Sequence, residues 1–225
     1  MSRFLPFGQW LIVTVLCTAI LLGSSGRLDL PMVWACVCVY SSFHLAIAFT
    51  VYKKDPDLFK ERARSGPGAK RWDRVWLVFY QLLSFATWIV AGLDIGRFHW
   101  SDTVPLWLQI VGLAGLAASF GFAVWAMATN TFFSQVVRIQ DDRGHHVVTG
   151  GPYRYVRHPG YAGGMLAWLC TALALGSWWA LFLAGVIVLV YVIRTALEDR
   201  TLHEELEGYA EYAKRVRYRL LPGVW

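Results

Sequence analysis

Long apolar segments, separated by short polar ones, make up most of the chain. Four of them, at 5–23, 31–52, 75–93 and 105–128, are close to the roughly 20 residues that an α-helix needs to cross a bilayer. A fifth, at 162–193, is too long for one ordinary crossing. Its GSWW sequence combines a glycine suited to a helix C-cap with two tryptophans suited to a membrane interface. We therefore expect a helical hairpin there, and five or six spans in total.

This pattern predicts an all-α integral membrane protein, and the composition agrees. Of the 225 residues, 56% are hydrophobic and 16% are charged, whereas a soluble domain carries about 25% charged residues. The 12 Trp, 13 Phe and 10 Tyr suit a protein with two membrane–water interfaces. We expect no cleavable signal peptide, because only Arg3 is basic before the first span and no A-x-A site precedes the turn at 27–29.

The basic residues predict the orientation in the membrane. With a cytoplasmic N-terminus, that side receives 19 of the 21 Lys and Arg: one before the first span, eight in 53–74, four in 129–160 and six from Arg194 onward. The other side receives only Arg27 and Arg97. Because cytoplasmic loops accumulate Lys and Arg, we expect both termini and both long loops in the cytoplasm, at an inner, plasma or endoplasmic-reticulum-type membrane.

The cysteines do not indicate a metal site or a disulfide framework. All four, Cys17, Cys36, Cys38 and Cys170, lie within apolar segments. Cys36 and Cys38 are two residues apart, so they point to different faces of a helix. We interpret the cysteines as small apolar side chains in a membrane core.

We divide the chain into a four-helix N-terminal region, residues 1–128, and a second region, residues 129–225. The charged loop at 53–74 is interpreted as a connector with a short surface helix at Pro56–Ala63. The second region is expected to hold a polar loop, the hairpin and a cytoplasmic helix at 194–225, which Gly208 interrupts. Polar residues gather against the membrane there, so we expect the functional site in this region.

The polar loop before the hairpin contains two expected turns. In QDDRGHH, Asp and Gly favour a turn, and the flanking VVRIQ and HHVVT can pair as a short β-hairpin. GGPY, at 150–153, is the second turn. Pro159 is placed to begin the next helix, because a missing N–H costs nothing at the first helical position. His158 then lies near a helix N-terminus, a position that attracts anions.

Candidate chemistry is concentrated in two segments on the predicted cytoplasmic side. Arg194 and Glu198 are four residues apart and share one helix face where the chain leaves the membrane; charges at that depth are costly unless they pair or line a polar cavity. Each feature has a structural explanation alone: an ion pair, a helix start, interfacial tyrosines. Together, Arg, Glu, His and Tyr suit a small zwitterion with an aromatic ring, such as S-adenosylmethionine or NADPH. The sequence has no Rossmann fingerprint and no P-loop.

The same two segments resemble the isoprenylcysteine carboxyl methyltransferase family and, more broadly, the membrane phospholipid methyltransferases. The shared pattern is G-x-Y-x-x-x-R-H-P-x-Y at 151–161, R-x-x-x-E-[ED]-x-x-L at 194–202 and Y-x-x-Y at 209–212. It begins near residue 138, while the N-terminal half is similar only in hydropathy and length. The resemblance implies S-adenosylmethionine as the cofactor.

The resemblance also implies which residues act. Its cofactor contacts fall on His145, His146, Val147, Val148, Tyr153, His158, Pro159, Gly160, Tyr161 and Glu198. Its substrate-side arginine falls on Arg194, which with Glu198 forms the predicted catalytic pair. The sequence departs from the family at two positions. Arg138 stands where the family often has Gln, with Gln135 nearby, and Asp199 stands where the second Glu is expected.

The expected function is methyl transfer to a lipophilic acceptor that arrives from the bilayer. The acceptor can be an isoprenylcysteine-like carboxylate, which Arg194 would orient, or a lipid amine or small thiol, which must lose a proton to Glu198 or His158. Partners are then a lipophilic or lipidated substrate and membrane lipid, with no nucleic acid. The small-residue run at 112–121 allows close packing within or between chains.

Two other functions are considered. An NADPH-dependent membrane sterol or steroid-type reductase is one, because those enzymes also resemble R-H-P-x-Y and V-x-Y-R-x-x-P, which recurs at 216–222. A non-catalytic membrane scaffold is the other.

Overall fold

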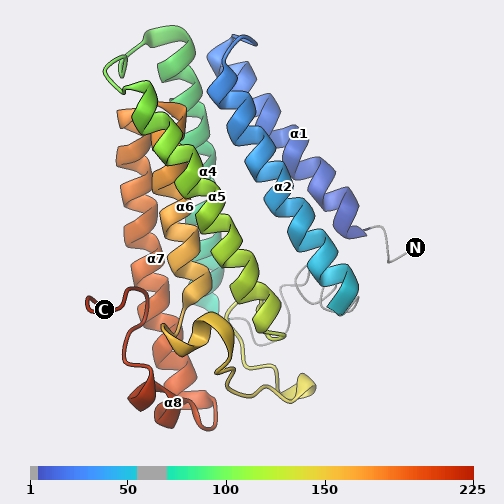
Figure 1. Cartoon of the computed structure of the whole chain (residues 1–225). Helices are drawn as coiled ribbons and strands as arrows, with labels where there is room; N and C mark the ends of the chain where they lie inside the picture. Colours follow the sequence, from blue (N-terminus) through green and yellow to red (C-terminus); the bar gives the residue numbers. More distant parts are fainter. Residues whose placement is uncertain (1–4, 55–69) are drawn as a thin grey trace.

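The structure, a computed structural model, describes residues 5–54 and 70–225. Every regular element among these residues is helical, which confirms the predicted all-α class. The long helices run side by side, and α8 and the chain that follows α5 lie at one end (Figure 1). The α-helices are α1 (Leu5–Ser25), α2 (Pro31–Lys54), α4 (Arg71–Leu93), α5 (Leu106–Thr129), α6 (Pro159–Leu175), α7 (Trp178–Glu205) and α8 (Tyr209–Arg215).

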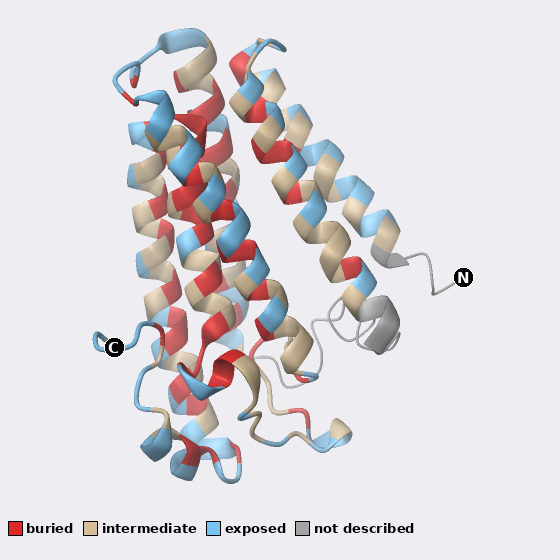
Figure 2. Ribbon diagram, in the orientation of Figure 1, coloured by how far each residue is buried: buried red, intermediate tan, exposed pale blue. Residues whose placement is uncertain are grey.

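Five of these helices are long and apolar enough to cross a membrane: α1, α2, α4 with the π-helix η2 (Asp94–Phe98) that extends it, α5 and α7. The apolar α6 is shorter, with 17 residues. The protein is thus a multi-pass membrane protein, as predicted. Large apolar side chains such as Ile12, Leu82 and Leu189 are exposed, which suits helices surrounded by lipid. Figure 2 shows the buried residues concentrated where the helices face one another.

The predicted hairpin is present, with arms of unequal length. α6 ends at Gly176, whose φ of 75° lies in the left-handed region that favours glycine. The Ser177 hydroxyl then caps α7 by accepting from the Ala180 N–H at 3.1 Å. α7 continues unbroken to Glu205, so residues 194–205 extend the membrane helix. Gly208, at φ 78°, separates α7 from α8, as predicted.

Helices α5 and α6 pack closely against each other. A Cβ at Gly112 would lie 2.6 Å from the Ala174 backbone nitrogen, and one at Gly163 would lie 3.0 Å from the Ser119 carbonyl oxygen. Small residues therefore allow the two backbones to approach, as is common in membrane helices. One hydrophobic core contains residues from both predicted regions. The division into 1–128 and 129–225 therefore remains a prediction about where the functional site lies. The core includes Cys36, Leu116, Ala167 and Ile187.

The predicted β-hairpin in the polar loop is wrong. Residues 136–149 contain no strand; a 3₁₀ turn, η3 (Asp141–Arg143), stands at the expected turn. The backbone N–H groups of Arg143 and His145 both donate to the Gln140 carbonyl, at 2.8 and 3.3 Å. The second expected turn is the 3₁₀ helix η4 (Gly151–Arg154). The surface helix predicted at Pro56–Ala63 lies outside the described residues.

Candidate functional site

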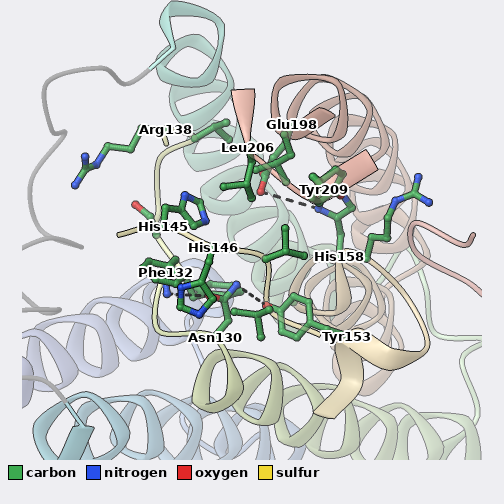
Figure 3. A pocket seen from close by; sticks show the side chains of 18 of the residues that line it. Asn130, Phe132, Arg138, His145, His146, Tyr153, His158, Glu198, Leu206 and Tyr209 are labelled. Carbon is green, nitrogen blue, oxygen red and sulfur yellow. Dashed lines mark hydrogen bonds and ion pairs between the residues drawn. The ribbon is translucent and has the colours of Figure 1, made fainter. Parts of the chain in front are cut away.

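A cavity lies at the end of the bundle that carries α8, between the chain that follows α5, the start of α6, and α7 and α8 (Figure 3). Pro159 and Arg194 are not among its lining residues, and Pro159 instead begins α6, where it is buried. The other nine predicted residues do line it: His145, His146, Val147, Val148, Tyr153, His158, Gly160, Tyr161 and Glu198. The fold therefore brings the two sequence motifs together across the helical hairpin.

One wall of the cavity comes from the chain that follows α5. Asn130 donates from Nδ2 to the Tyr153 hydroxyl at 3.2 Å, and its Oδ1 accepts from the Phe132 N–H at 2.8 Å. The Phe132 ring packs on the imidazoles of His145 and His146, with ring centroids 4.6 and 4.9 Å away. Burial, with the neighbouring His146, lowers the pKa of His145. This wall thus offers an aromatic face, an amide and a neutral imidazole.

The opposite wall carries Glu198 from α7. The hydroxyl of Tyr161 donates to the Glu198 carboxylate. The His158 ring is stacked with Tyr161, with centroids 5.8 Å apart and planes 4° apart. Its Nδ1 lies 4.0 Å from Glu198 Oε1, the contact drawn in Figure 3. A carboxylate with a side chain 21% exposed therefore faces the cavity beside an imidazole.

Asp199, the next residue of α7, is buried and joins several segments. Arg157 donates to it through Nε and Nη2 at 2.8 and 3.0 Å, and Arg219 donates through Nε at 2.8 Å. The Tyr209 hydroxyl donates at 2.8 Å, and His158 Nε2 lies 3.2 Å away. Burial alone would lower the pKa of Arg157, but the Asp199 carboxylate raises it. Burial and the same carboxylate together raise the pKa of Tyr209. Asp199 thereby ties the R-H-P segment to α8 and to the C-terminal tail.

The C-terminal tail also holds the R-H-P segment through the backbone. The Arg157 N–H donates to the Tyr218 carbonyl at 2.9 Å, and the His158 N–H donates to the Arg219 carbonyl at 2.9 Å. His158 is the N-cap residue of α6. Its position is therefore fixed by the tail, the helix and Asp199 together.

Arg194 lies among buried partners beside the cavity. Its Nε is 3.1 Å from Asp73 Oδ1, and its Nη2 donates to the Gln135 carbonyl at 2.6 Å. The guanidinium lies over the Trp76 ring at 4.0 Å and 5.2 Å from the Tyr161 ring centroid. Since Tyr161 lines the cavity and Arg194 does not, the tyrosine ring lies at the boundary between the cavity and the arginine.

Several residues of this site received no role from the sequence. Asp73 precedes the apolar segment of α4, and nothing nearby in sequence indicated its partner Arg194. Asn130 and Phe132 follow α5 and belong to no motif. Two tyrosines of α8 were visible only as the Y-x-x-Y pattern: Tyr209 bonds Asp199, and Tyr212 donates to the Tyr153 carbonyl at 2.7 Å.

Comparison with known proteins supports the motifs. Residues 107–207 match the family model of the phospholipid methyltransferases. The chain is 29% identical over 148 residues to "Protein-S-isoprenylcysteine O-methyltransferase" of Rattus norvegicus, covering 61% of this chain and 49% of that protein. It is 30% identical over 135 residues to "Cobalt-zinc-cadmium resistance protein CzcN" of Cupriavidus metallidurans, covering 57% and 56%. The chain thus spans about half the length of the curated relatives it matches.

The fold is similar to that of a solved membrane enzyme, the eukaryotic intramembrane Ras methyltransferase ICMT. The TM-score is 0.58 at 16% identity, covering 94% of this chain and 74% of that one. The chain therefore has the fold of an intramembrane methyltransferase. The resemblance recognised from its two motifs, to the isoprenylcysteine carboxyl methyltransferase family, is therefore confirmed by the family model, the curated relatives and the solved structure.

Proposed function

We propose that this protein is an integral membrane, S-adenosylmethionine-dependent methyltransferase that acts on a lipophilic acceptor. The observation that carries the proposal is the cavity, in which residues of both motifs meet at the end of apolar helices. The family match and the methyltransferase relatives support the same class of reaction.

The cavity residues suit the cofactor. Bound S-adenosylmethionine would supply a methyl group on a positively charged sulfonium. The Phe132 ring offers an apolar face to a base, and the Glu198 carboxylate can accept from ribose hydroxyls or an ammonium group. Gly160 keeps the wall at the start of α6 thin, because a Cβ there would lie 2.5 Å from the Phe133 ring. We assign the cofactor to this cavity, with His145, His146 and Tyr153 on the wall opposite Glu198.

The acceptor is proposed to come from the bilayer, between helices. Arg194 lies over the Trp76 ring at 4.0 Å and 5.2 Å from the Tyr161 ring centroid, and neither Arg194 nor Trp76 lines the cavity. Because alignment of the reacting groups supplies much of the catalysis in methyl transfer, we propose that Tyr161, Glu198 and Arg194 position the two reactants. The 19:2 distribution of basic residues supports a cytoplasmic position for the cavity and both termini.

Calorimetry on the detergent-purified protein tests the proposal. We expect micromolar-range binding of S-adenosylmethionine and at least about tenfold weaker binding by Glu198→Ala, since a hydrogen bond to a charged group contributes about 1.5–3 kcal/mol. Glu211→Ala is the control, because that exposed glutamate pairs with Lys214 on the surface of α8. Binding of NADPH alone would assign the protein to the reductases, and binding of neither would favour a scaffold.

A further inference from the structure

His158 and Asp199 form a buried pair whose geometry fixes the orientation of the imidazole. His158 Nε2 lies 3.2 Å from Asp199 Oδ1, and the two side chains are 5% and 2% exposed. A carboxylate can only accept, so Nε2 must carry the proton. A neutral ring then presents an unprotonated Nδ1, and this nitrogen faces Glu198 at 4.0 Å in the cavity wall. The arrangement gives the cavity a proton acceptor that a carboxylate orients from behind.

The arginines around the cavity form ion pairs with acidic side chains. These pairs bear on which chemical class of methyl acceptor the site can take. The pairs are Arg157 and Arg219 with Asp199, Arg138 with Asp142, and Arg194 with Asp73, at 2.8 to 3.1 Å. An acceptor carboxylate would have to displace Asp73 from Arg194 and would approach Glu198, a like charge. A neutral nucleophile meets neither obstacle. The charges of the site therefore favour an acceptor whose reacting atom carries a proton.

We propose that His158, oriented by Asp199, is the catalytic base of this site and that the methyl acceptor reacts through a thiol or amine. This inference rests on the methyltransferase function proposed above. The acceptor's proton passes to Nδ1, and its sulfur or nitrogen lone pair forms the bond to the methyl carbon. The methyl–sulfonium bond breaks, and its electron pair stays on the cofactor sulfur, which becomes a neutral thioether. The imidazolium then returns its proton to water. Asp199 is a positioning residue, because it acts through His158.

Four charged or titratable side chains face or adjoin the His158 ring. Asp199 and Glu198 come from α7, Tyr209 Oη from α8 lies 3.4 Å from Nε2, and Tyr161 from α6 is stacked on the ring. Arg157 precedes it in the chain and shares Asp199.

Nitrogen NMR of the ¹⁵N-histidine-labelled protein tests the base without any ligand. His158 is one of six histidines, so its signals are assigned by their loss in His158→Gln. The expected result is a neutral ring that is protonated at Nε2 and unprotonated at Nδ1. A ring protonated at Nδ1, or one that stays an imidazolium up to high pH, overturns the proposal. Asp199→Glu should retain the tautomer, and Asp199→Asn should alter it.

Transfer of a labelled methyl group to matched probes tests the acceptor. Dodecanethiol, dodecylamine and dodecanoate share one chain length and differ in the reacting group. Transfer to the thiol or the amine is expected, and transfer to dodecanoate alone, or to none of the three, overturns the inference. Binding of S-adenosylmethionine is measured in parallel, so that the two failures can be told apart. If S-adenosylmethionine does not bind, the proposed function is refuted; if it binds and the methyl group is transferred only to dodecanoate, only the inference about the acceptor is refuted.

The kinetics of the variants separate a base from a structural residue. At saturating S-adenosylmethionine, His158→Gln should lower kcat by about a hundredfold or more, the usual contribution of a general base, and remove the fall in kcat toward low pH. A change in KM with kcat unaltered contradicts the assignment. His99→Gln is the matched control and should keep full activity, because the exposed His99 pairs with Asp102 after η2 and does not line the cavity.

Discussion

Removal of the Asp73 carboxylate should destabilise the bundle where α4, α7 and the chain that follows α5 meet. Asp73 is fully buried. Its Oδ2 accepts from the Val137 N–H at 2.7 Å, and its Oδ1 lies 3.1 Å from Arg194 Nε. The substitution Asp73→Ala therefore leaves a buried guanidinium without its counter-charge and a backbone N–H without its acceptor.

The expected cost follows from these two losses. Breaking a buried ion pair by removing one partner costs about 3–5 kcal/mol, and an orphaned buried N–H costs about 1–3 kcal/mol. Arg194 keeps its bond to the Gln135 carbonyl and its contact with the Trp76 ring. Asp73 also lies in the first turn of α4, where small shifts can admit water. We therefore expect a loss near the lower end, about 3–4 kcal/mol in the free energy of unfolding.

A titration with denaturing detergent in mixed micelles, followed by circular dichroism, measures this free energy. Asp29→Ala is the control, because its pair with Arg27 is exposed and exposed ion pairs contribute little to stability. The double variant Asp73→Ala/Arg194→Met leaves no buried charge and should be more stable than Asp73→Ala alone. If Asp73→Ala costs no more than the control, or if the two substitutions are additive within about 0.5 kcal/mol, the proposed coupling is refuted.

Three further predictions concern the loop, the hairpin and pH. Gly160→Ala places a Cβ 2.5 Å from the Phe133 ring; calorimetry should show weaker binding of S-adenosylmethionine, which Phe133→Ala should restore in the double variant. Ser177→Ala removes the cap of α7 and a bond to Asp94, and should cost about 1–2 kcal/mol of unfolding free energy. Burial lowers the pKa of His145 in the folded protein, so the unfolded chain binds a proton at a higher pH than the folded protein does. The contribution of neutral His145 to stability is therefore complete above the usual histidine pKa of about 6.5, and it is lost as the pH falls from that value through the lowered pKa. The thermal midpoint of the wild type should therefore fall more than that of His145→Gln on acidification, and an equal fall would exclude His145 as the source.

The sequence was sufficient for features that depend on local physics. Apolar length defined the spans, and the glycine of GSWW defined the turn of the hairpin, because Gly176 adopts a left-handed φ at the end of α6. The cap that Ser177 provides for α7 is known only from the structure. Pro159 begins α6 as predicted. The limits of the helices were less well predicted. α4 begins at Arg71 and not at residue 75, since a helix can extend beyond its apolar segment into polar residues.

The sequence was insufficient where the backbone bonds to distant residues. Residues 136–149 alternate enough to favour a hairpin, yet the Val137 N–H bonds the Asp73 side chain and its carbonyl accepts from the Lys70 N–H at 3.3 Å. Both backbone groups of Val137 are thus satisfied by the start of α4, and no cross-strand partner is required. Asp73 lies 121 residues from Arg194, so no local pattern could reveal that pair.

Glu198 and Asp199 show most clearly what the fold adds. They are adjacent acids in one motif, and sequence alone gives them similar roles. A helix turns about 100° per residue, so Glu198 faces the cavity while Asp199 faces Arg157 and Arg219. The charge of Asp199 is met by two guanidinium groups, whereas the hydroxyl of Tyr161 is the group that donates to Glu198. The two adjacent carboxylates therefore have different surroundings, which only the fold reveals.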